Sequence, residues 1–360
     1  MLFEALFNLT GPRPIVAGTG LIALDLVIPN EPLLLPQLWA GGTCGNVLTI
    51  LSFLGWEAFP IARLRNDSSS SQITRDFRRW GVRLDYLALD SDGSTPVIVH
   101  HIHCSPDRGT THSFSRRCAS CGKRLPWYKP VRVSDAVRIA PTLPSIAVFF
   151  FDRTSAGALY LARHAAASGA LVVFEPSASS NAKQLSQAMK IAHVVKYSYE
   201  RLSGLEQLCE EKGVPLVIET RGSAGLRFFS RLRSSSGKWE ISESLPTRRV
   251  VDTAGCGDWC TAGLITVLGG HGVDAFYKST PDELRYALRF GQFLAAWNCG
   301  FEGARGGMYR SDALTPQEFM MRFLAGDQPH LPQTFPEMQS HEHFVEYACA
   351  SCGESLYVYK

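Results

Sequence analysis

The sequence lacks a long apolar segment. No stretch reaches about 18 apolar residues without a charge or a proline, which is the length that a membrane-spanning helix needs. The first residues, Met1 to Pro14, have an acid where a signal peptide has a basic region, and they contain no long apolar core. We therefore expect neither a membrane partner nor secretion.

The sequence also lacks an excess of charge, internal repeats and long low-complexity tracts. Its net charge of +3 over 360 residues is too small to indicate a nucleic-acid or membrane partner by itself. Hydrophobic residues make up 45% and charged residues 19%, which is typical of a globular protein and excludes a disordered or fibrous one. The length favours one large domain with appended pieces, or two domains.

Cysteine, in contrast, is plentiful. Ten cysteines in a chain of this length, with two pairs at Cys-x-x-Cys spacing, fit a reducing compartment and metal binding better than a disulfide framework. We expect a cytoplasmic protein.

Apolar runs with strand character alternate with runs of helical periodicity, and we expect strands joined by crossover helices. The predicted strands are 15–28, 58–64, 146–151, 170–174, 194–197 and 216–219, and the predicted helices are 46–54, 72–80, 155–168, 181–192, 199–212 and 259–268. This order predicts an α/β fold with a doubly wound, mostly parallel sheet and helices on both faces. Residues 28–40 and 93–115 are expected to form a small β lid. The histidines of the lid, His100, His101, His103 and His112, are interpreted as exposed surface rather than as metal ligands.

A glycine-rich turn precedes the last predicted helix. Asp252-Thr253-Ala254-Gly255-Cys256-Gly257-Asp258 leads into an apolar run that begins at Trp259. Without a Cβ at Gly255 and Gly257 the backbone can approach an anion, and the amides of a helix start favour negative charge. Asp258, in the first turn, is placed to take a proton from a hydroxyl. Taken alone, the turn is more simply a tight turn whose carboxylate caps the helix.

This turn resembles the late signature Asp-Thr-x-Gly-Ala-Gly-Asp of the ribokinase-like, or PfkB-type, carbohydrate kinases, with Cys256 in place of Ala. The resemblance extends over about residues 15–308. It implies an ATP-dependent, Mg²⁺-requiring kinase in which Asp258 is the base and the amides of Ala254, Gly255, Cys256 and Gly257 form an anion hole. A monovalent cation near Asp252 is also common in the family.

The same resemblance implies an acceptor site near the start of the chain. Gly41, Gly42 and Asn46 match the Gly-Gly-x-x-x-Asn segment that holds substrate hydroxyls in the family, and Asp25 falls where the family has an Asp that binds two of them. Read without the family, Asp25 could pair with an arginine and Asn46 could cap a helix. The acceptor would be a sugar or a nucleoside.

A nucleotide site is implied near the end of the predicted sheet. Thr220, Gly222 and Gly225 follow a strand as the family's nucleotide loop does. The family's Asn-x-x-Glu should fall at 198–201 and is not kept, although Glu200 lies beside it, which leaves magnesium handling in question. Glu175 could share the water shell of the magnesium ion or cap a helix.

Two identical pentapeptides, Cys-Ala-Ser-Cys-Gly, begin at Cys118 and Cys349. Four thiolates suit tetrahedral zinc, so we predict a structural zinc site held by Cys118, Cys121, Cys349 and Cys352. A redox dithiol, or two unrelated pairs, is the alternative. We divide the chain into a kinase domain at 1–330, with a zinc-knuckle insertion at about 116–135, and a tail at 331–360 that completes the zinc site.

Between residues 108 and 138 eight basic residues accompany one acid. A solvated face explains this run better than nucleic-acid binding, which is the alternative that a zinc knuckle beside basic residues raises. The remaining functional alternatives are a nucleoside kinase and a non-catalytic sensor of the same fold. A homodimer joined through the lids is typical of the family.

Overall fold

The computed structural model describes residues 12–28, 36–105, 109–176, 181–233, 235–246, 250–310, 345–348 and 355–358. Its largest element is a nine-stranded sheet in the order β13-β12-β11-β10-β9-β8-β1-β4-β5. Neighbouring strands from β11 to β5 run parallel, and β12 and β13 are antiparallel additions at one edge. The strands are β1 (Ile15–Thr19), β4 (Glu57–Leu64), β5 (Leu87–Leu89), β8 (Val148–Phe151), β9 (Leu171–Phe174), β10 (Val194–Ser198), β11 (Leu216–Thr220), β12 (Leu226–Ser230) and β13 (Trp239–Ser242).

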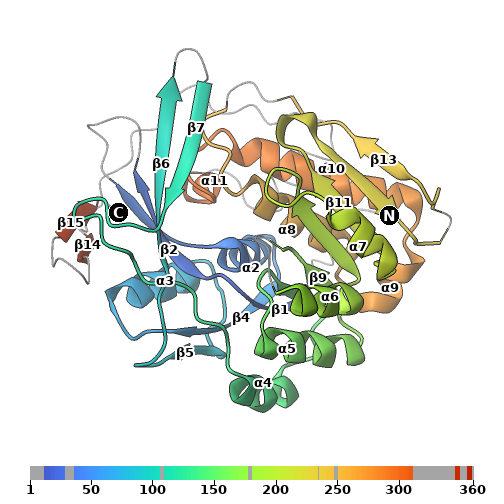
Figure 1. The fold of residues 1–360 in the computed structure, drawn as a ribbon, viewed down its shortest axis with the longest axis horizontal. Helices are drawn as coiled ribbons and strands as arrows, with labels where there is room; N and C mark the ends of the chain where they lie inside the picture. Colours follow the sequence, from blue (N-terminus) through green and yellow to red (C-terminus); the bar gives the residue numbers. More distant parts are fainter. Residues whose placement is uncertain are drawn as a thin grey trace.

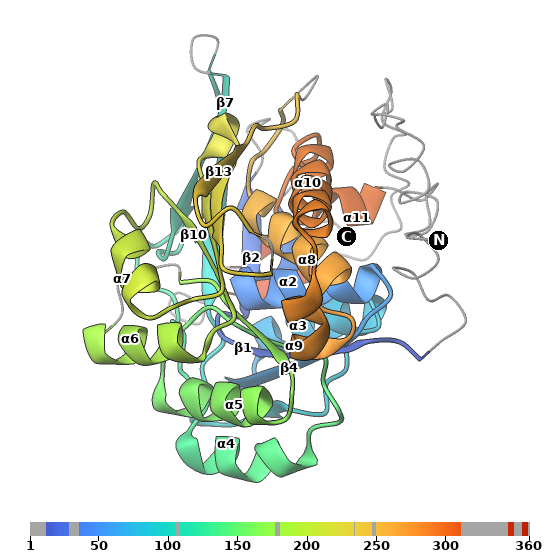
Figure 2. The same cartoon turned by 90° about the vertical axis from the view of Figure 1, so that its right-hand side faces the viewer.

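Helices cover both faces of this sheet (Figures 1 and 2). One face carries α2 (Thr43–Phe53), α3 (Ser68–Arg79), α8 (Cys256–Leu268), α9 (Gly272–Lys278) and α10 (Pro281–Asn298), and the other carries α4 (Val133–Ile139), α5 (Ala156–Ala167), α6 (Ala182–Ile191) and α7 (Leu205–Glu211). The apolar side chains of β8 divide between two cores: Val148 and Phe150 pack on the α8 face, and Phe149 and Phe151 on the α5 face. A strand buried on both faces is continuously apolar, which confirms the predicted doubly wound α/β fold.

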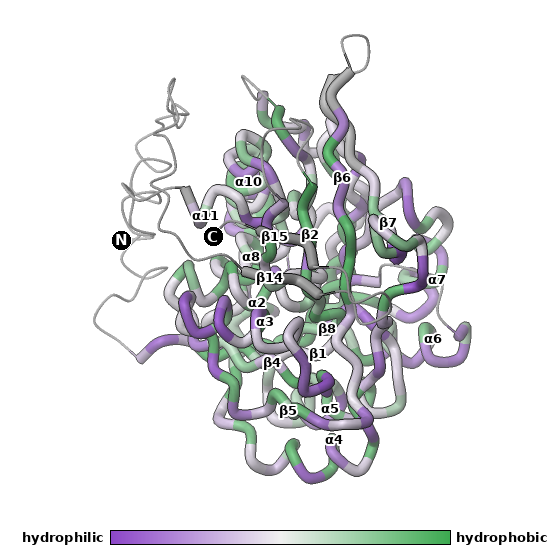
Figure 3. Tube along the Cα trace, turned by 90° about the vertical axis from the view of Figure 1, so that its left-hand side faces the viewer, coloured by the Kyte–Doolittle hydropathy of each residue, from purple (hydrophilic) through white to green (hydrophobic). Residues whose placement is uncertain are grey.

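Hydropathy follows the same layering. In Figure 3 the central strands such as β8 are hydrophobic, whereas hydrophilic stretches collect on outer helices such as α6. Burying one apolar face of a helix against a sheet and leaving the opposite face to solvent is the ordinary arrangement in this fold class.

A second sheet of four strands stands beside the first in the order β3-β2-β6-β7 (Figure 1). It consists of β2 (Ala23–Ile28), β3 (Gln37–Gly41), β6 (Val97–Ser105) and β7 (Gly109–Ser115). This is the small sheet that the sequence predicts as a lid. Its β2 strand carries Asp25, and β3 leads directly into α2.

The single strand predicted at 15–28 is wrong, because the chain leaves one sheet and enters the other at Gly20. Gly20 has φ +152°, and a Cβ there would lie 1.6 Å from Oδ1 of Asp152. Only glycine fits this position. The helix predicted at 199–212 also begins late, at Leu205, after Gly204 with φ +81°.

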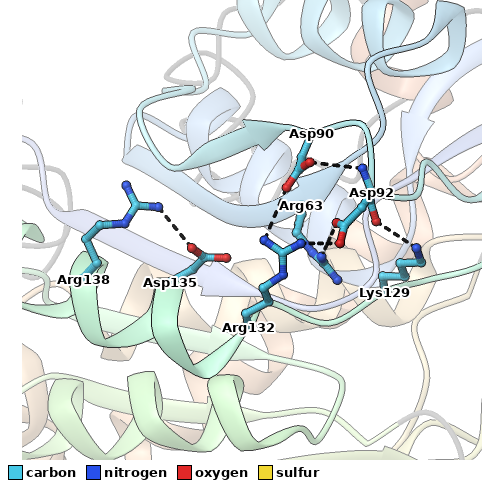
Figure 4. A network of polar contacts seen from close by, with 7 residues as sticks. All are labelled: Arg63, Asp90, Asp92, Lys129, Arg132, Asp135 and Arg138. Atoms are coloured by element: carbon cyan, nitrogen blue, oxygen red, sulfur yellow. Dashed lines mark hydrogen bonds and ion pairs between the residues drawn. The ribbon is translucent and has the colours of Figure 1, made fainter.

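Polar contacts fasten the basic segment before α4 to the turn that follows β5 (Figure 4). Arg132 pairs with Asp90 and Asp92, Arg63 also pairs with Asp92, and Lys129 donates to the Asp92 carbonyl at 2.8 Å. Part of the basic run is therefore paired with acids of the same molecule.

Two further pieces complete the described chain. The short helix α11 (Gly306–Arg310) follows α10, and an isolated hairpin is formed by β14 (Val345–Ala348) and β15 (Ser355–Val358). The hairpin contacts α3. Among the helices within the described ranges, none combines the length and the apolar character needed to cross a membrane.

Candidate active site

The glycine-rich turn and the start of α8 form the centre of the candidate site. Gly255 has φ +75°, and a Cβ there would lie 2.2 Å from the Ala304 carbonyl oxygen, so the turn requires glycine. The Ala254 amide donates to Oδ1 of Asp252 at 2.9 Å. The amides of Gly257 and Asp258 have no acceptor within the described part of the chain. These two amides, rather than that of Ala254, are available to an anion.

Asp258 lies in the first turn of α8 and is buried, with 9% exposure. Its Oδ2 accepts a hydrogen bond of 2.7 Å from Nδ2 of Asn46 in α2. Burial, together with the nearby Glu175 carboxylate, raises the pKa of Asp258 to about 7 although the Asn46 hydrogen bond opposes this. Its pKa near neutrality suits a general base. The sequence thus names two residues, 212 positions apart, that the fold brings into contact.

A buried ion pair flanks this centre. Nζ of Lys196 in β10 donates to Oε1 of Glu175 at 2.7 Å, and Oγ1 of Thr261 donates to Oε2 at 2.6 Å. Burial disfavours charge on Lys196, but the Glu175 carboxylate together with the nearby Cys260 and Asp258 side chains raises the pKa of Lys196. A Cβ at Gly257 would lie 3.5 Å from both charged atoms. Lys196, which sequence reasoning missed, therefore places a positive charge beside the glycine-rich turn.

The predicted acceptor residues also gather in one place. Asp25 in β2 is half-buried as a residue, and burial of its carboxyl group raises its pKa to about 7, although the nearby Arg305 charge and a hydrogen bond from the Gly42 amide oppose this. A Cβ at Gly41 would lie 1.9 Å from Oδ2 of Asp25. The space that glycine leaves at Gly41 is therefore occupied by the Asp25 carboxylate.

Arg305 connects Asn46 to the backbone next to Gly41. Its Nε donates to Oδ1 of Asn46 at 3.1 Å, and its Nη2 donates to Oδ2 of Asp76 at 2.8 Å and to the Ala40 carbonyl. Sequence reasoning missed Arg305, because the stretch 300–307 is rich in glycine and contains charged residues, which is the composition of an exposed loop. Its exposure is 1%.

The nucleotide-loop residues lie together at the end of β11. Thr220 closes the strand, a 3₁₀ turn at Gly222–Ala224 follows, and Gly225 has φ +87°. A Cβ at Gly222 would lie 3.6 Å from Oε1 of Glu200, which puts this carboxylate beside the loop.

The Asp252 carboxylate is held by hydrogen bonds from backbone amides. Its Oδ1 accepts from the Ala254 amide, its Oδ2 accepts from the Gly303 amide at 2.8 Å, and Nε2 of His100 lies 3.4 Å away. The interpretation of His100 as exposed lid surface is wrong, since its side chain is 2% exposed. The histidine is buried because it reaches from β6 of the lid to the signature turn.

Only half of the predicted zinc site lies within the described residues. Cys118 is buried and Cys121 is half-buried in a tight turn, whereas Cys349 and Cys352 lie outside the described residues. No group of three or more His, Cys, Asp or Glu side chains suited to a metal ion occurs in the described ranges.

Comparison with protein families matches residues 36–309 to the pfkB family carbohydrate kinases. The chain belongs to this family. The pfkB assignment covers three quarters of the chain and confirms the resemblance carried by the signature, and with it an enzyme that transfers a phosphoryl group to a small-molecule alcohol. The added zinc knuckles are outside what the family assignment shows.

Relatives of this pfkB chain include sugar kinases of animals and bacteria. It is 25% identical to the ketohexokinase of Mus musculus over 325 residues, which covers 80% of this chain and 96% of the relative. It is 26% identical to the fructokinase of Klebsiella pneumoniae over 289 residues, 73% of this chain and 87% of the relative.

Solved structures share the fold of this pfkB chain. A fructokinase from Xylella fastidiosa with bound ATP has a TM-score of 0.63 at 19% identity and covers 81% of this chain and 94% of that one. A nucleoside kinase from Burkholderia thailandensis in complex with inosine has a TM-score of 0.61 at 19% identity, with 86% and 96% coverage.

Proposed function

We propose that this kinase transfers the γ-phosphoryl group of ATP to a hydroxyl of a sugar or sugar-like alcohol, with Asp258 as the general base. The observation that carries the proposal is the position of Asp258: a buried carboxyl at a helix start, with a pKa of about 7, beside the Lys196 ammonium and the Gly257 amide, which has no acceptor within the described ranges. A base with this pKa is in part deprotonated at neutral pH and can still take a proton. The amides and the ammonium offset the charge of a phosphoryl group in transfer.

The acceptor would lie between Asp25 and Asp258, against Gly41, Gly42 and Asn46. A hexose is favoured, because the relatives matched by sequence include a ketohexokinase and two fructokinases. A nucleoside is the second candidate, since the Burkholderia structure with the same fold binds inosine.

For the nucleotide we propose the loop that contains Thr220, Gly222 and Gly225, with Glu200 at its side. The Xylella fructokinase carries ATP in a fold of the same kind. Magnesium would be needed to bridge the phosphates, and Glu175 and Glu200 are the nearby carboxylates that could hold its water shell. A monovalent cation near Asp252 is part of the same proposal.

An ADP-release assay over a panel of hexoses, pentoses and nucleosides tests the assignment. Turnover of one class, lost in Asp258→Asn and on removal of magnesium, is the expected result. A non-catalytic sensor would instead bind a sugar or nucleotide without releasing ADP with any member of the panel.

We also infer a structural zinc ion held by both Cys-Ala-Ser-Cys-Gly segments. In the first segment, the backbones of Arg117 and Arg124 form an antiparallel β-bridge that encloses six residues, the first of which is Cys118. The Cys118 amide donates to the Lys123 carbonyl at 2.9 Å. In the second, Ala348 of β14 pairs with Ser355 of β15, again across six residues that begin with a cysteine. In both places, therefore, the same pentapeptide lies between two residues that are paired in antiparallel fashion, which is the arrangement expected of two zinc knuckles.

Elemental analysis of the purified chain tests this inference. We expect one zinc per chain, lost in the Cys118→Ser, Cys349→Ser double variant and kept in the control Cys209→Ala, whose thiol is buried elsewhere. Absence of zinc from the unaltered protein, or full zinc in the double variant, would refute the site.

A cytoplasmic location and a lid-mediated homodimer are part of the same proposal. Seven cysteines in the described ranges, among them Cys118 and Cys209, are free thiols, which fits a reducing compartment. Light scattering of the purified chain and imaging of a fluorescent fusion test the two statements separately.

A further inference from the structure

Arg305 is a buried cation that lies near Asp25 and contacts Asn46, the hydrogen-bond partner of the proposed base Asp258. It lies in the loop between α10 and α11, and its guanidinium donates hydrogen bonds to three different segments of the chain: Asn46 in α2, Asp76 in α3 and Ala40 in β3. Asp76 is itself fixed, because it accepts from the Ala40 amide at 3.0 Å and from the Tyr309 hydroxyl at 2.8 Å. The guanidinium therefore has a defined position.

That position decides which way the Asn46 amide points. A guanidinium has N–H donors and no acceptor, so it can bond only the Oδ1 side of an amide. With Oδ1 held by Nε of Arg305 at 3.1 Å, the Nδ2 side is turned to Oδ2 of Asp258 at 2.7 Å. A flipped amide would place two acceptors against each other at Asp258.

Two polar atoms here lack a partner within the described ranges: Oδ1 of Asp25 and Nη1 of Arg305, both buried. Their groups are close enough for the Arg305 charge to lower the pKa of Asp25 against the effect of burial. A buried donor and a buried acceptor left without partners are costly, and a hydroxyl can serve both since it donates and accepts. This points to an alcohol as the missing partner.

We propose that Arg305 has two roles in this kinase: Nε orients Asn46 so that its amide donates to Asp258, and Nη1 binds a hydroxyl of the acceptor next to Asp25. The first role makes Arg305 a positioning residue that acts through Asn46. The proposal rests on the function proposed above, in which Asp258 is the base.

The variant Arg305→Lys tests both roles. Lysine keeps the charge, but a single ammonium cannot reproduce the planar fork that bonds Asn46, Asp76 and Ala40 together. With Asn46 free to turn away, the Asp258 carboxylate loses a hydrogen bond, and the acid limb of the kcat/KM profile moves to higher pH by about one unit. We expect the KM for the acceptor to rise roughly tenfold while the KM for ATP is unchanged.

A matched control is Arg63→Lys. Arg63, near the C-terminal end of β4, is also a mostly buried arginine, with 11% side-chain exposure, and it pairs with Asp92 in the turn after β5. Its pH profile and both KM values should equal those of the unaltered protein. A folded Arg305→Lys variant with an unchanged pH profile and unchanged acceptor KM overturns the proposal.

Asn46→Asp covers the case in which Arg305→Lys does not fold. It keeps an acceptor for Arg305 but replaces the donor to Asp258 by a second carboxylate, so the acid limb must again move to higher pH. An unmoved limb in this variant also overturns the proposal. Full activity of Asp258→Asn would instead refute the underlying assignment of the base, whatever Arg305 does.

A second inference comes from two thiols at the other side of the signature turn. Sγ of Cys256, the first residue of α8, lies 3.0 Å from Sγ of Cys299, which follows α10. The two helices are in close contact, since a Cβ at Gly263 would lie 2.6 Å from Cα of Gly291. The thiols are therefore held at nearly bonding distance by two packed helices.

We infer that peroxide converts this pair to a disulfide and stops the kinase reversibly. The Cys299 thiolate attacks a peroxide oxygen, which gives a sulfenic acid and releases hydroxide; this hydroxide takes up the proton that the Cys299 thiol had given to solvent and becomes one water. The Cys256 thiol then attacks the sulfenic sulfur, the S–S bond forms, and the hydroxyl leaves as a second water. Bond formation draws the sulfurs about 1 Å closer and shifts the start of α8, which carries Gly257 and Asp258.

Peroxide treatment followed by a thiol reductant is the test. We expect activity to fall and then return, with a Cys256–Cys299 linked peptide after digestion of the oxidised protein. Cys299→Ser should keep normal activity and resist peroxide. Equal peroxide sensitivity in Cys299→Ser, or no linked peptide in the inactivated protein, overturns the inference.

Discussion

Asp25 and Asp258 are two buried carboxyl groups whose pKa values are both raised to about 7. Burial is the first cause in each, because a carboxylate loses more hydration than a neutral acid. They differ in their surroundings: Asp258 accepts a hydrogen bond from Asn46, whereas Oδ1 of Asp25 has no partner within the described ranges. This difference fits the roles that we propose, in which Asp258 moves a proton and Asp25 binds a hydroxyl.

Asp258→Asn is expected to lower kcat by a factor of about 10³, because the amide cannot accept the proton of the acceptor hydroxyl. The fold should be kept, since asparagine removes a buried charge without changing the side-chain volume. ADP-release kinetics give the rate and thermal unfolding gives the stability. A variant that keeps most of its turnover contradicts the role of base.

Asp25→Asn should stabilise the protein in a way that depends on pH. A carboxyl whose pKa is higher in the folded state than its ordinary 3.8 contributes stability that is complete below 3.8 and is lost as the pH rises through about 7. Each such group destabilises by at most about 4 kcal/mol above pH 7. Urea unfolding at pH 5 and pH 8 should show that the advantage of the variant is larger at pH 8.

Secondary-structure elements hold Asp25 and Asp258 in position, and substitutions at two glycines test how closely these elements pack. Gly41→Ala puts a Cβ 1.9 Å from Oδ2 of Asp25, so the carboxylate must leave its position. We expect the acceptor KM to rise about tenfold or more with the ATP KM unchanged, measured by steady-state kinetics. Equal KM values in variant and parent would show that Asp25 does not contact the acceptor.

The contact between α8 and α10 is the second test at this scale. Gly263→Ala brings a Cβ to 2.6 Å from the backbone of Gly291 and should destabilise the protein by about 1–3 kcal/mol through overpacking. Gly270→Ala is the matched control, since a Cβ there meets nothing within 4 Å. The two variants are compared by their free energies of unfolding, which should differ if the helices are in contact.

The sequence predicts elements well where a local pattern decides them. The continuous apolar runs of β8 and β9 can only be buried strands, and Gly255 and Gly257 mark the start of α8 within a few residues. Sequence reasoning fails where a distant group decides the conformation: Gly20 ends β1 because Asp152 occupies the space of its Cβ. Lys196 and Arg305 were missed for the same reason, since their partners lie far away in the chain.

At the scale of the whole molecule, the basic run around the first knuckle can be tested as a nucleic-acid surface. Arg132 and Lys129 are engaged with Asp90 and Asp92 (Figure 4), and the Arg116 guanidinium lies 3.7 Å from the centre of the Trp127 ring. Groups already paired add little to phosphate binding. We expect fluorescence anisotropy to show no binding of a labelled DNA or RNA oligonucleotide at about 150 mM salt. Tight binding that weakens steeply with salt would contradict this.

The contact between Asn46 and Arg305 spans 259 positions of the chain. During synthesis, α2 and every strand of the parallel sheet leave the ribosome before Arg305 does. A nascent or truncated chain that ends short of this residue can contain the base, the phosphate turn and the complete sheet, yet leave Asn46 without the group that orients it. Activity should accordingly appear only after nearly the whole kinase fold has been made, so that half-finished chains consume no ATP.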